Sequence, residues 1–207
     1  EHTQRTYKDL WTDFRTTDCR PDGKVWDMYS SITNYVFGTD QNTGGGGREG
    51  ADYNREHSMP KSWFHDGYPM YTDLFHLYPT DSYINSMRSN YPFGEVGTVS
   101  KQSSGGFSKL GKSAVPGYSG TVFEPADEYK GDFARTYFYM VTRYEAQVAG
   151  WSSDMLSGDA YPAFTDWALE VLLKWHRQDP VSDKEVDRNN AVYGIQHNRN
   201  PYIDYPV

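Results

Sequence analysis

A glutamate and a histidine stand next to each other in the segment 54–64, with the basic residues Arg55 and Lys61 on either side. The carboxylate of Glu56 can hold a hard divalent cation, and the imidazole of His57 can take a proton from water near neutral pH. Cleavage of a phosphodiester bond needs these two functions close together. The pair is therefore a candidate centre for phosphate chemistry.

A second polar cluster follows shortly afterwards and includes a predicted helix over about 81–90, with Thr80 as its N-cap. On that helix Asp81, Asn85 and Arg88 share one face. The side-chain oxygen of Asn85 can bind a metal ion, although the same residue type also serves as an ordinary surface or capping asparagine. We interpret the two clusters as halves of one metal-dependent active site.

The histidines and the single cysteine argue against zinc. The six histidines show neither H-x-x-x-H nor H-E-x-x-H spacing, and Cys19 is the one thiol of the chain, so an internal disulfide is excluded as well. A hard ion held by oxygen atoms and water fits the acidic and amide side chains better. This chemistry indicates Mg²⁺ or Mn²⁺.

One geometric objection concerns the adjacency of Glu56 and His57. Neighbouring residues of a strand point to opposite faces, so the chain must twist there or the two side chains must act from different sides of the ion. A structural salt bridge explains a Glu-His pair as well as a functional role does. Spacing alone leaves both interpretations open.

The length allows one domain with a full core or two small ones, and the charge balance argues against a histone-like protein that binds nucleic acid by charge alone. The chain has 207 residues, with 20 basic against 28 acidic residues and a formal net charge of −8. A nuclease is still compatible with this balance because only its groove must be positive. The aromatic content of 16% predicts a core built largely from rings, and it suits base stacking and sugar binding equally.

Hydrophobic periodicity and capping signals predict a mainly helical α+β domain over residues 1–207. The expected strands are 24–29 and the segment around Glu56-His57, and short strands among loops are expected over 91–120. The expected helices are 4–15, 81–90, 125–148, 166–176 and one that Ser182-x-x-Glu185 opens as a capping box and that runs to about residue 193.

Five motifs occur in the order of a known family over residues from about 25 to the C-terminus, and together they are far more specific than any one alone. They are Arg55-Glu56-His57-Ser58-Met59-Pro60, Asp73-Leu74-Phe75-His76-Leu77-x-Pro79, Ile84-Asn85-x-x-Arg88-Ser89-Asn90, Gly131-Asp132-Phe133-Ala134-Arg135-Thr136-Tyr137-Phe138-Tyr139-Met140 and Asn198-Arg199-Asn200-Pro201-Tyr202-Ile203-Asp204. On these motifs the chain resembles the endonuclease I family of bacterial non-specific nucleases.

The resemblance implies a ββα-metal (His-Me finger) nuclease core, in which a strand carries the base and a following helix carries a metal ligand. By this likeness His57 is the general base that activates water, and Glu56 and Asn85 hold one Mg²⁺, for which Mn²⁺ or Ca²⁺ can substitute. The products have 5′-phosphate ends. Both side chains of the Glu-His pair reach one site only if the strand is distorted there, and we expect that distortion.

Two departures from the family pattern matter. Family members commonly have a histidine where this chain has Phe75. Some also place a phosphate-binding arginine in a long insertion between the His and Asn motifs, whereas here the connection between Lys61 and Arg88 is short and holds no arginine or lysine. Phosphate contacts must then come from elsewhere. Arg88 and Arg135 are the candidates for a catalytic role, and Arg55, Lys61 and Arg199 are the candidates for substrate binding.

The resemblance further implies DNA and RNA as substrates and a secreted or periplasmic protein, without a membrane or an obligate protein partner. The residues present contain no apolar signal segment and no membrane-spanning run. Two alternatives belong to other classes. One is a secreted polysaccharide-binding module, which would bind glycan without metal, and the other is a catalytically silent member of the fold that retains nucleic-acid binding.

Overall fold

The interior of the protein is organised around helix α3 (Lys130–Arg143), whose side chains are buried from Lys130 to Met140. The computed structural model describes residues 2–44 and 46–206. Helix α3 packs along α5 (Asp166–Gln178) and contacts the short α7 (Pro201–Asp204). Most of the buried apolar side chains belong to one continuous cluster, which is the main core, and a small second cluster lies beside Tyr53.

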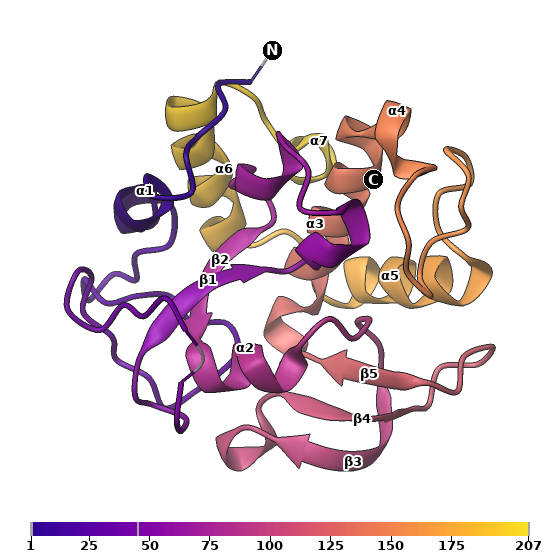
Figure 1. Cartoon of the computed structure of the whole chain (residues 1–207), viewed down its shortest axis with the longest axis horizontal. Helices are drawn as coiled ribbons and strands as arrows, with labels where there is room; N and C mark the ends of the chain where they lie inside the picture. The colour runs from indigo at the N-terminus through magenta and orange to yellow at the C-terminus, as the bar shows by residue number, and fades with distance from the viewer. Residues whose placement is uncertain (1, 45, 207) are drawn as a thin grey trace.

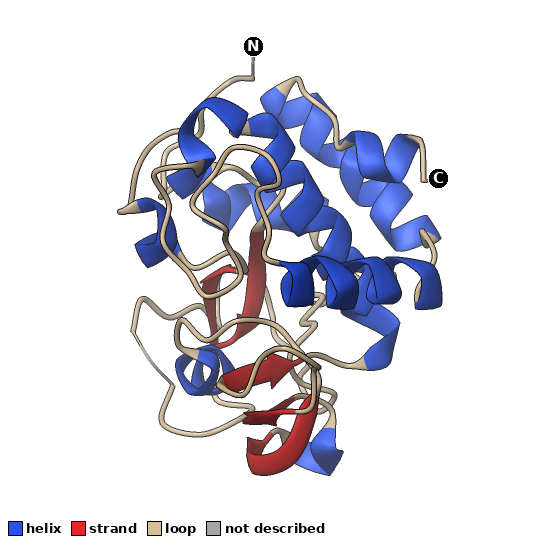
Figure 2. Cartoon of the chain, turned by 90° about the vertical axis from the view of Figure 1, so that its right-hand side faces the viewer, coloured by secondary structure: helices blue, strands red, loops and turns tan. Residues whose placement is uncertain are grey.

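The described part of the chain combines helices with two small antiparallel sheets (Figures 1 and 2), which confirms the α+β class. The remaining elements in chain order are α1 (Leu10–Thr17), β1 (Tyr53–His57), β2 (Leu77–Asp81), α2 (Ser82–Arg88), β3 (Val96–Gln102), β4 (Lys109–Ser113), β5 (Thr121–Glu124), α4 (Glu145–Val148) and α6 (Asp183–Gln196), with 3₁₀ turns at Lys61–Phe64, Met70–Thr72, Ser104–Gly106 and Asp127–Tyr129.

Strands β1 and β2 pair in an antiparallel manner, and α2 follows β2 without an intervening loop. This places α2 beside the strand that carries the Glu-His pair, as Figure 1 shows. Strands β3, β4 and β5 form the second sheet, with β4 in the centre. In the view of Figure 2 most helices lie above and the sheets below.

Local capping signals define the starts of two helices. The capping box at Ser182 and Glu185 is confirmed, because each side chain hydrogen-bonds to the backbone of the other residue. The helix after β2 is capped by Asp81 rather than by the expected Thr80, since a carboxylate oxygen of Asp81 accepts the backbone N–H of Ile84 at 2.9 Å. The carboxylate is thus the cap, one residue later than predicted.

Three element predictions are wrong in extent or in kind. Residues 24–29 form no strand, because the side chain of Asp27 accepts the backbone N–H of Tyr29 at 2.8 Å and competes with sheet pairing. The first helix starts at Leu10 rather than near residue 4. The single helix predicted over 125–148 is divided at Tyr144, whose backbone is not helical, into α3 and α4.

A buried carboxyl group, that of Asp73, connects the segment before β2 to the C-terminal helices. One oxygen accepts the hydroxyl groups of Tyr139 and Tyr144 at 2.7 and 2.6 Å. The other accepts the backbone N–H of Phe75 at 3.0 Å and the amide of Gln196 at 2.8 Å. Four donors therefore depend on one side chain that is fully enclosed.

We expect Asp73→Ala to lower the free energy of unfolding by roughly 3 kcal/mol or more, because it leaves several buried donors without an acceptor. Urea unfolding measures this loss. Asp73→Asn is the matched control, since it keeps the shape and one acceptor oxygen, and it should cost clearly less. Equal stability of wild type and Asp73→Ala would contradict the proposed importance of this network.

Candidate functional site

A pocket of about 310 Å³ is lined by five of the residues that the sequence singled out, and these come from different elements. Arg55, Glu56 and His57 come from β1, Lys61 from the following 3₁₀ turn, and Asn85 from α2. The structure thus brings the two polar clusters of the sequence together.

The expected distortion of the strand at Glu56-His57 is wrong. The pair faces Tyr78 and Leu77 of β2 in regular register, without a bulge. His57 is the last residue of β1, so the pocket lies at the end of the strand. Side chains from both faces can line a hollow at a strand end, which removes the geometric objection without a backbone irregularity.

The imidazole of His57 is held in one tautomer. Its Nε2 lies 2.9 Å from the carbonyl oxygen of Tyr71, which can only accept, so Nε2 carries the hydrogen and Nδ1 is left to accept a proton. Burial, assisted by the neighbouring His76, lowers the pKa of His57 to about 3. The ring therefore stays neutral near pH 7. The ring of Tyr7 stacks at 5.8 Å between centroids and that of Tyr71 lies at 4.9 Å.

Glu56 is anchored through one of its two carboxylate oxygens. Oε1 accepts both the hydroxyl group of Tyr29 at 2.8 Å and a guanidinium nitrogen of Arg88, so Oε2 remains for a further partner. Burial raises the pKa of Glu56 above its usual range, and the positive charge of Arg88 opposes that shift. The side chain is fixed in position before any ligand binds.

Asn85 is oriented by the strand beside it. Its amide nitrogen donates to the side-chain oxygen of Asn54 at 2.7 Å, which leaves the carbonyl oxygen Oδ1 to bind another group. Glu56 and Asn85 both line this pocket, and each keeps one hard oxygen, Oε2 and Oδ1, that accepts none of the hydrogen bonds described above. Such a pair fits an Mg²⁺ ion that keeps several water ligands. Within residues 2–44 and 46–206 no group of three or more His, Cys, Asp or Glu side chains is arranged to hold a metal.

Arg88 lies in the interior rather than in the pocket, and its side chain is fully enclosed. Its guanidinium group donates to Glu56, to the carbonyl oxygen of His57 at 3.1 Å and to that of Ser58 at 2.6 Å. It therefore cannot reach a phosphate in this arrangement. Arg88 holds the carboxylate of Glu56 and the end of β1 in place.

Arg135 and Arg199 lie apart from this pocket. Arg135 is fully buried and forms a two-point ion pair with Glu185 at 2.6 and 2.8 Å. Arg199 pairs with Asp204 near the C-terminus. The guanidinium groups of both are already engaged by carboxylates, so we do not include either residue in the proposed site.

Two cations do lie at the pocket. The Arg55 guanidinium is stacked on Tyr7 and Trp11, 3.6 and 4.3 Å from the ring centroids, and donates to the carbonyl oxygen of Tyr7 at 2.6 Å. The side chain of Lys61 is 47% exposed and pairs with the exposed Asp66 at 3.2 Å. A surface pair of this kind is weak, so Lys61 can leave it for a phosphate.

Several residues at the site were not foreseen from the sequence. The Glu-His pair is surrounded by Tyr7, Tyr29 and Tyr71. The one signal for them in the sequence was the large number of tyrosines in the chain. Phe75, the residue expected to depart from the family pattern, lies in the core with its ring 4.5 Å from that of Tyr139. It does not line the His57 pocket, so the departure at this position affects packing.

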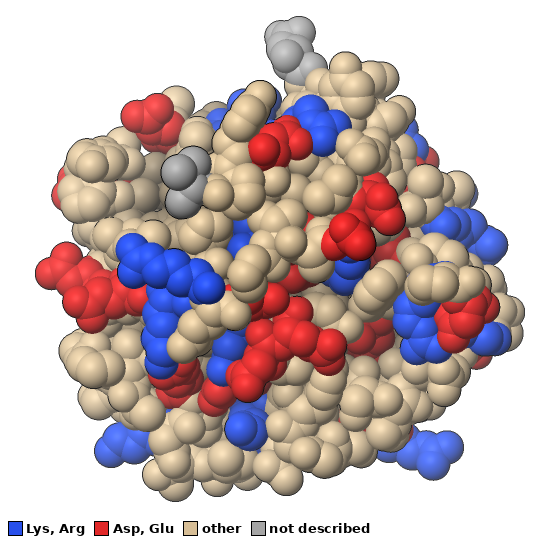
Figure 3. Space-filling view, turned by 180° about the vertical axis from the view of Figure 1, so that it is seen from behind, with Lys and Arg blue, Asp and Glu red and all other residues tan. Residues whose placement is uncertain are grey.

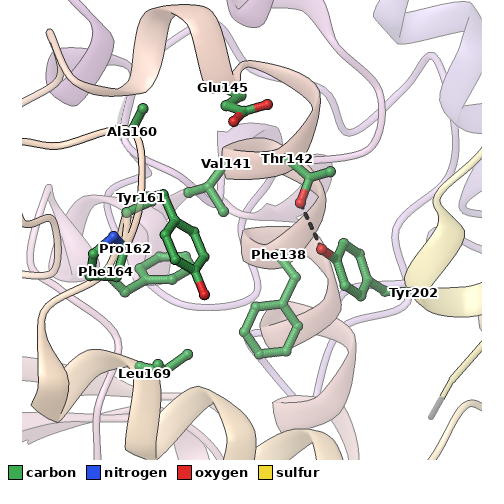
Figure 4. A pocket seen from close by; sticks show the side chains of 11 residues that line it. Phe138, Val141, Thr142, Glu145, Ala160, Tyr161, Pro162, Phe164, Leu169 and Tyr202 are labelled. Carbon is green, nitrogen blue, oxygen red and sulfur yellow. Dashed lines mark hydrogen bonds between the residues drawn. The ribbon is translucent and has the colours of Figure 1, made fainter.

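A second hollow, of about 390 Å³, is apolar and contains none of the predicted site residues. Figure 4 shows that Phe138 and Val141 of α3 line it together with Tyr161 and Tyr202. The hydroxyl groups of Tyr202 and Thr142 form a hydrogen bond of 2.6 Å. Few of the side chains that line this hollow are titratable near neutral pH. We therefore locate the candidate active site in the smaller polar pocket.

The surface charge is mixed on the face opposite that of Figure 1. Figure 3 shows acidic side chains gathered near the middle of that face, with basic ones beside them. Such a face offers no continuous positive surface to a polyanion. Separately, no helix among residues 2–44 and 46–206 combines the length and the apolar character needed to cross a bilayer.

Comparisons with known proteins agree on one family. The family model described as Endonuclease I matches residues 1–207. The extracellular ribonuclease of Bacillus amyloliquefaciens is 36% identical over 220 residues, which cover 99% of this chain and 67% of the relative. The extracellular ribonuclease of Bacillus subtilis (strain 168) is 35% identical over 210 residues, with the same two coverages. The periplasmic deoxyribonuclease of Aeromonas hydrophila is 26% identical over 132 residues, 64% of this chain and 47% of the relative.

Proposed function

The chain belongs to the endonuclease I family, and from this premise we propose that it is a metal-dependent endonuclease that hydrolyses phosphodiester bonds of DNA and RNA. One observation carries the proposal. Glu56, His57 and Asn85 line a single polar pocket at the end of β1, with Arg55 and Lys61 at the same pocket. We further propose that β1, β2 and α2 are the ββα-metal core that the sequence led us to expect.

In the proposed reaction Nδ1 of His57 takes the proton of a water molecule as that water attacks phosphorus. The carbonyl oxygen of Tyr71 keeps the hydrogen of the ring on Nε2, so the base nitrogen is available at neutral pH. The bond between phosphorus and the 3′ oxygen breaks as the new bond forms, the leaving 3′ oxygen takes a proton from solvent water, and the phosphate stays on the 5′ oxygen. A positioned base of this kind contributes about 10²–10⁴-fold to the rate.

Glu56 and Asn85 are the residues that would hold the Mg²⁺ ion, through Oε2 and Oδ1. The bound ion supplies positive charge that stabilises the transition state. Arg88 fixes the carboxylate, and Tyr29 shares that task through its hydroxyl group. Lys61 and Arg55 attract and orient the substrate phosphates at the pocket edge.

The substrate range follows from the nucleophile. A water molecule activated by His57 replaces the 2′-hydroxyl group as the attacking group, so the reaction needs no ribose-specific chemistry. DNA and RNA are therefore both substrates in our proposal, which is supported by relatives named ribonuclease and deoxyribonuclease. Names that describe extracellular or periplasmic proteins support a secreted or periplasmic location. The same names argue against the polysaccharide-binding alternative.

We expect EDTA to abolish plasmid nicking and added Mg²⁺ to restore it. Asn85→Ala should raise the Mg²⁺ concentration for half-maximal nicking by at least about 10-fold, since the ion loses a fixed oxygen ligand. Asn190→Ala, which changes an exposed asparagine of another helix, is the matched control and should behave as wild type. Nicking that persists unchanged in EDTA would refute the role of the metal.

A further inference from the structure

A second polar hollow adjoins the proposed active site and has no role in the mechanism so far. It measures about 450 Å³, within the size range of small-ligand sites. Ser62 and Asn90 line both this hollow and the His57 pocket, so the two are neighbours that share a wall. We call it the flanking pocket.

The two pockets differ in charge. Arg55 and Lys61 lie at the His57 pocket, where phosphate is to be cleaved. Among the described residues that line the flanking pocket, the one charged side chain is Asp154, whose carboxylate accepts the hydroxyl group of Tyr118 at 2.7 Å. An acidic group there disfavours a second phosphate. The pocket suits an uncharged part of the substrate that carries polar edges.

Aromatic side chains form part of its wall. Tyr91 is 39% exposed, so a substantial part of its side chain is open to a ligand. The ring of Tyr118 is backed by Trp167, with 4.3 Å between centroids and 10° between planes. Rigid rings of this kind are the surfaces on which proteins stack the bases of single-stranded nucleic acids.

The wall is already positioned relative to the catalytic groups. Nε of Arg88 donates to the carbonyl oxygen of Tyr91 at 3.2 Å, while the same guanidinium group holds Glu56. The backbone N–H of Ser152 donates to the carbonyl oxygen of Trp63 at 2.9 Å, which joins two further residues that line the flanking pocket. One buried arginine thus connects the proposed metal-binding carboxylate with the exposed tyrosine.

We propose that the flanking pocket receives the base of a nucleotide next to the scissile phosphate, and that this base stacks on Tyr91. The inference rests on the proposed nuclease function. A base that is paired inside a duplex must leave its stack to enter such a pocket, and this costs free energy that an unpaired base does not spend. The preferred substrates are therefore single strands and unpaired regions, of DNA and RNA alike.

The test compares Tyr91→Ala with Tyr83→Ala on a single-stranded oligonucleotide and on its duplex. Tyr83 is the matched control, because it is 41% exposed on α2 and lies outside the residues that line either pocket. We expect Tyr91→Ala to lower kcat/KM on the single strand by roughly 5- to 100-fold and to change duplex cleavage little. Tyr91→Trp should retain activity, since it keeps an aromatic face, and Tyr83→Ala should match wild type.

A scan with one abasic site at each position of the single strand identifies the base concerned. One abasic position next to the cut should lower the kcat/KM of the wild type as much as Tyr91→Ala lowers it on the intact strand. On that abasic substrate, Tyr91→Ala and wild type should then have the same kcat/KM. Equal losses on single strand and duplex, or additive effects of the variant and every abasic site, would overturn the inference. If the wild type cleaves neither strand form, the proposed function itself fails, which is a different outcome.

Discussion

Replacing His57 with alanine should slow cleavage of plasmid and oligonucleotide substrates by about 10²–10⁴-fold, because the variant lacks the group that removes a proton from the attacking water. The fold should persist, since the ring's hydrogen bond goes to one carbonyl oxygen, that of Tyr71. Single-turnover rates at saturating Mg²⁺ measure the effect, and circular dichroism checks the fold.

His65→Ala provides the matched control. His65 is an exposed histidine on the loop that follows the 3₁₀ turn of Lys61, and it takes no part in the proposed chemistry. It should cleave at the rate of wild type. If His57→Ala cleaved as fast as an active His65→Ala, the assignment of the base would be wrong. If neither the wild type nor His65→Ala cleaved, the result would support the alternative of a catalytically silent member of the fold.

The pH dependence adds a second readout for the same residue. An ordinary histidine loses its basic form as the pH falls through about 6.5. Burial lowers the pKa of His57 to about 3, so protonation of this ring removes no activity between pH 8 and pH 5. A wild-type rate that halves as the pH falls through 6.5, at saturating Mg²⁺, would contradict this expectation. If the same loss of rate were absent in a Glu56 variant, a group other than His57 would control it.

The second large effect concerns two buried arginines that differ in what they touch. Arg88→Met and Arg135→Met should each lower the free energy of unfolding by about 3–5 kcal/mol, because each leaves a buried carboxylate without its partner. Of these two arginines, only Arg88 contacts Glu56. We therefore expect Arg88→Met alone to raise the Mg²⁺ requirement of the molecules that remain folded.

Urea unfolding and Mg²⁺ titrations of nicking, corrected for the folded fraction, separate these two effects. Arg135→Met is the control for general destabilisation, since its partner Glu185 opens α6 and lies outside the pocket. An equal shift in the Mg²⁺ requirement for both variants would contradict the specific connection between Arg88 and the carboxylate.

Local signals predicted the parts of the fold that depend on neighbours in sequence. Ser182 and Glu185 are three residues apart, so their reciprocal capping was readable directly. The strand of Glu56 and the helix of Asn85 were also identified, and the chain between them is short. These two elements were enough to bring the predicted metal ligands into one pocket.

The two buried arginines could not be assigned correctly from the sequence. The sequence predicts phosphate contacts for Arg88 and Arg135, because the connection between Lys61 and Arg88 supplies no arginine or lysine, but both side chains are fully buried and paired with carboxylates. Their partners Glu56 and Glu185 are 32 and 50 residues away in the chain, a separation at which sequence patterns carry no pairing signal. The roles of Tyr7, Tyr29 and Tyr71 around the site were hidden for the same reason.

Diffraction from crystals of the wild-type protein soaked in Mn²⁺, recorded at a wavelength where manganese scatters anomalously, tests the central claim most directly. We predict one strong peak within coordination distance of Oε2 of Glu56 and Oδ1 of Asn85, with Nδ1 of His57 facing a water molecule nearby. A peak elsewhere in the molecule, with the oxygens of Glu56 and Asn85 unliganded, would contradict the proposed active site.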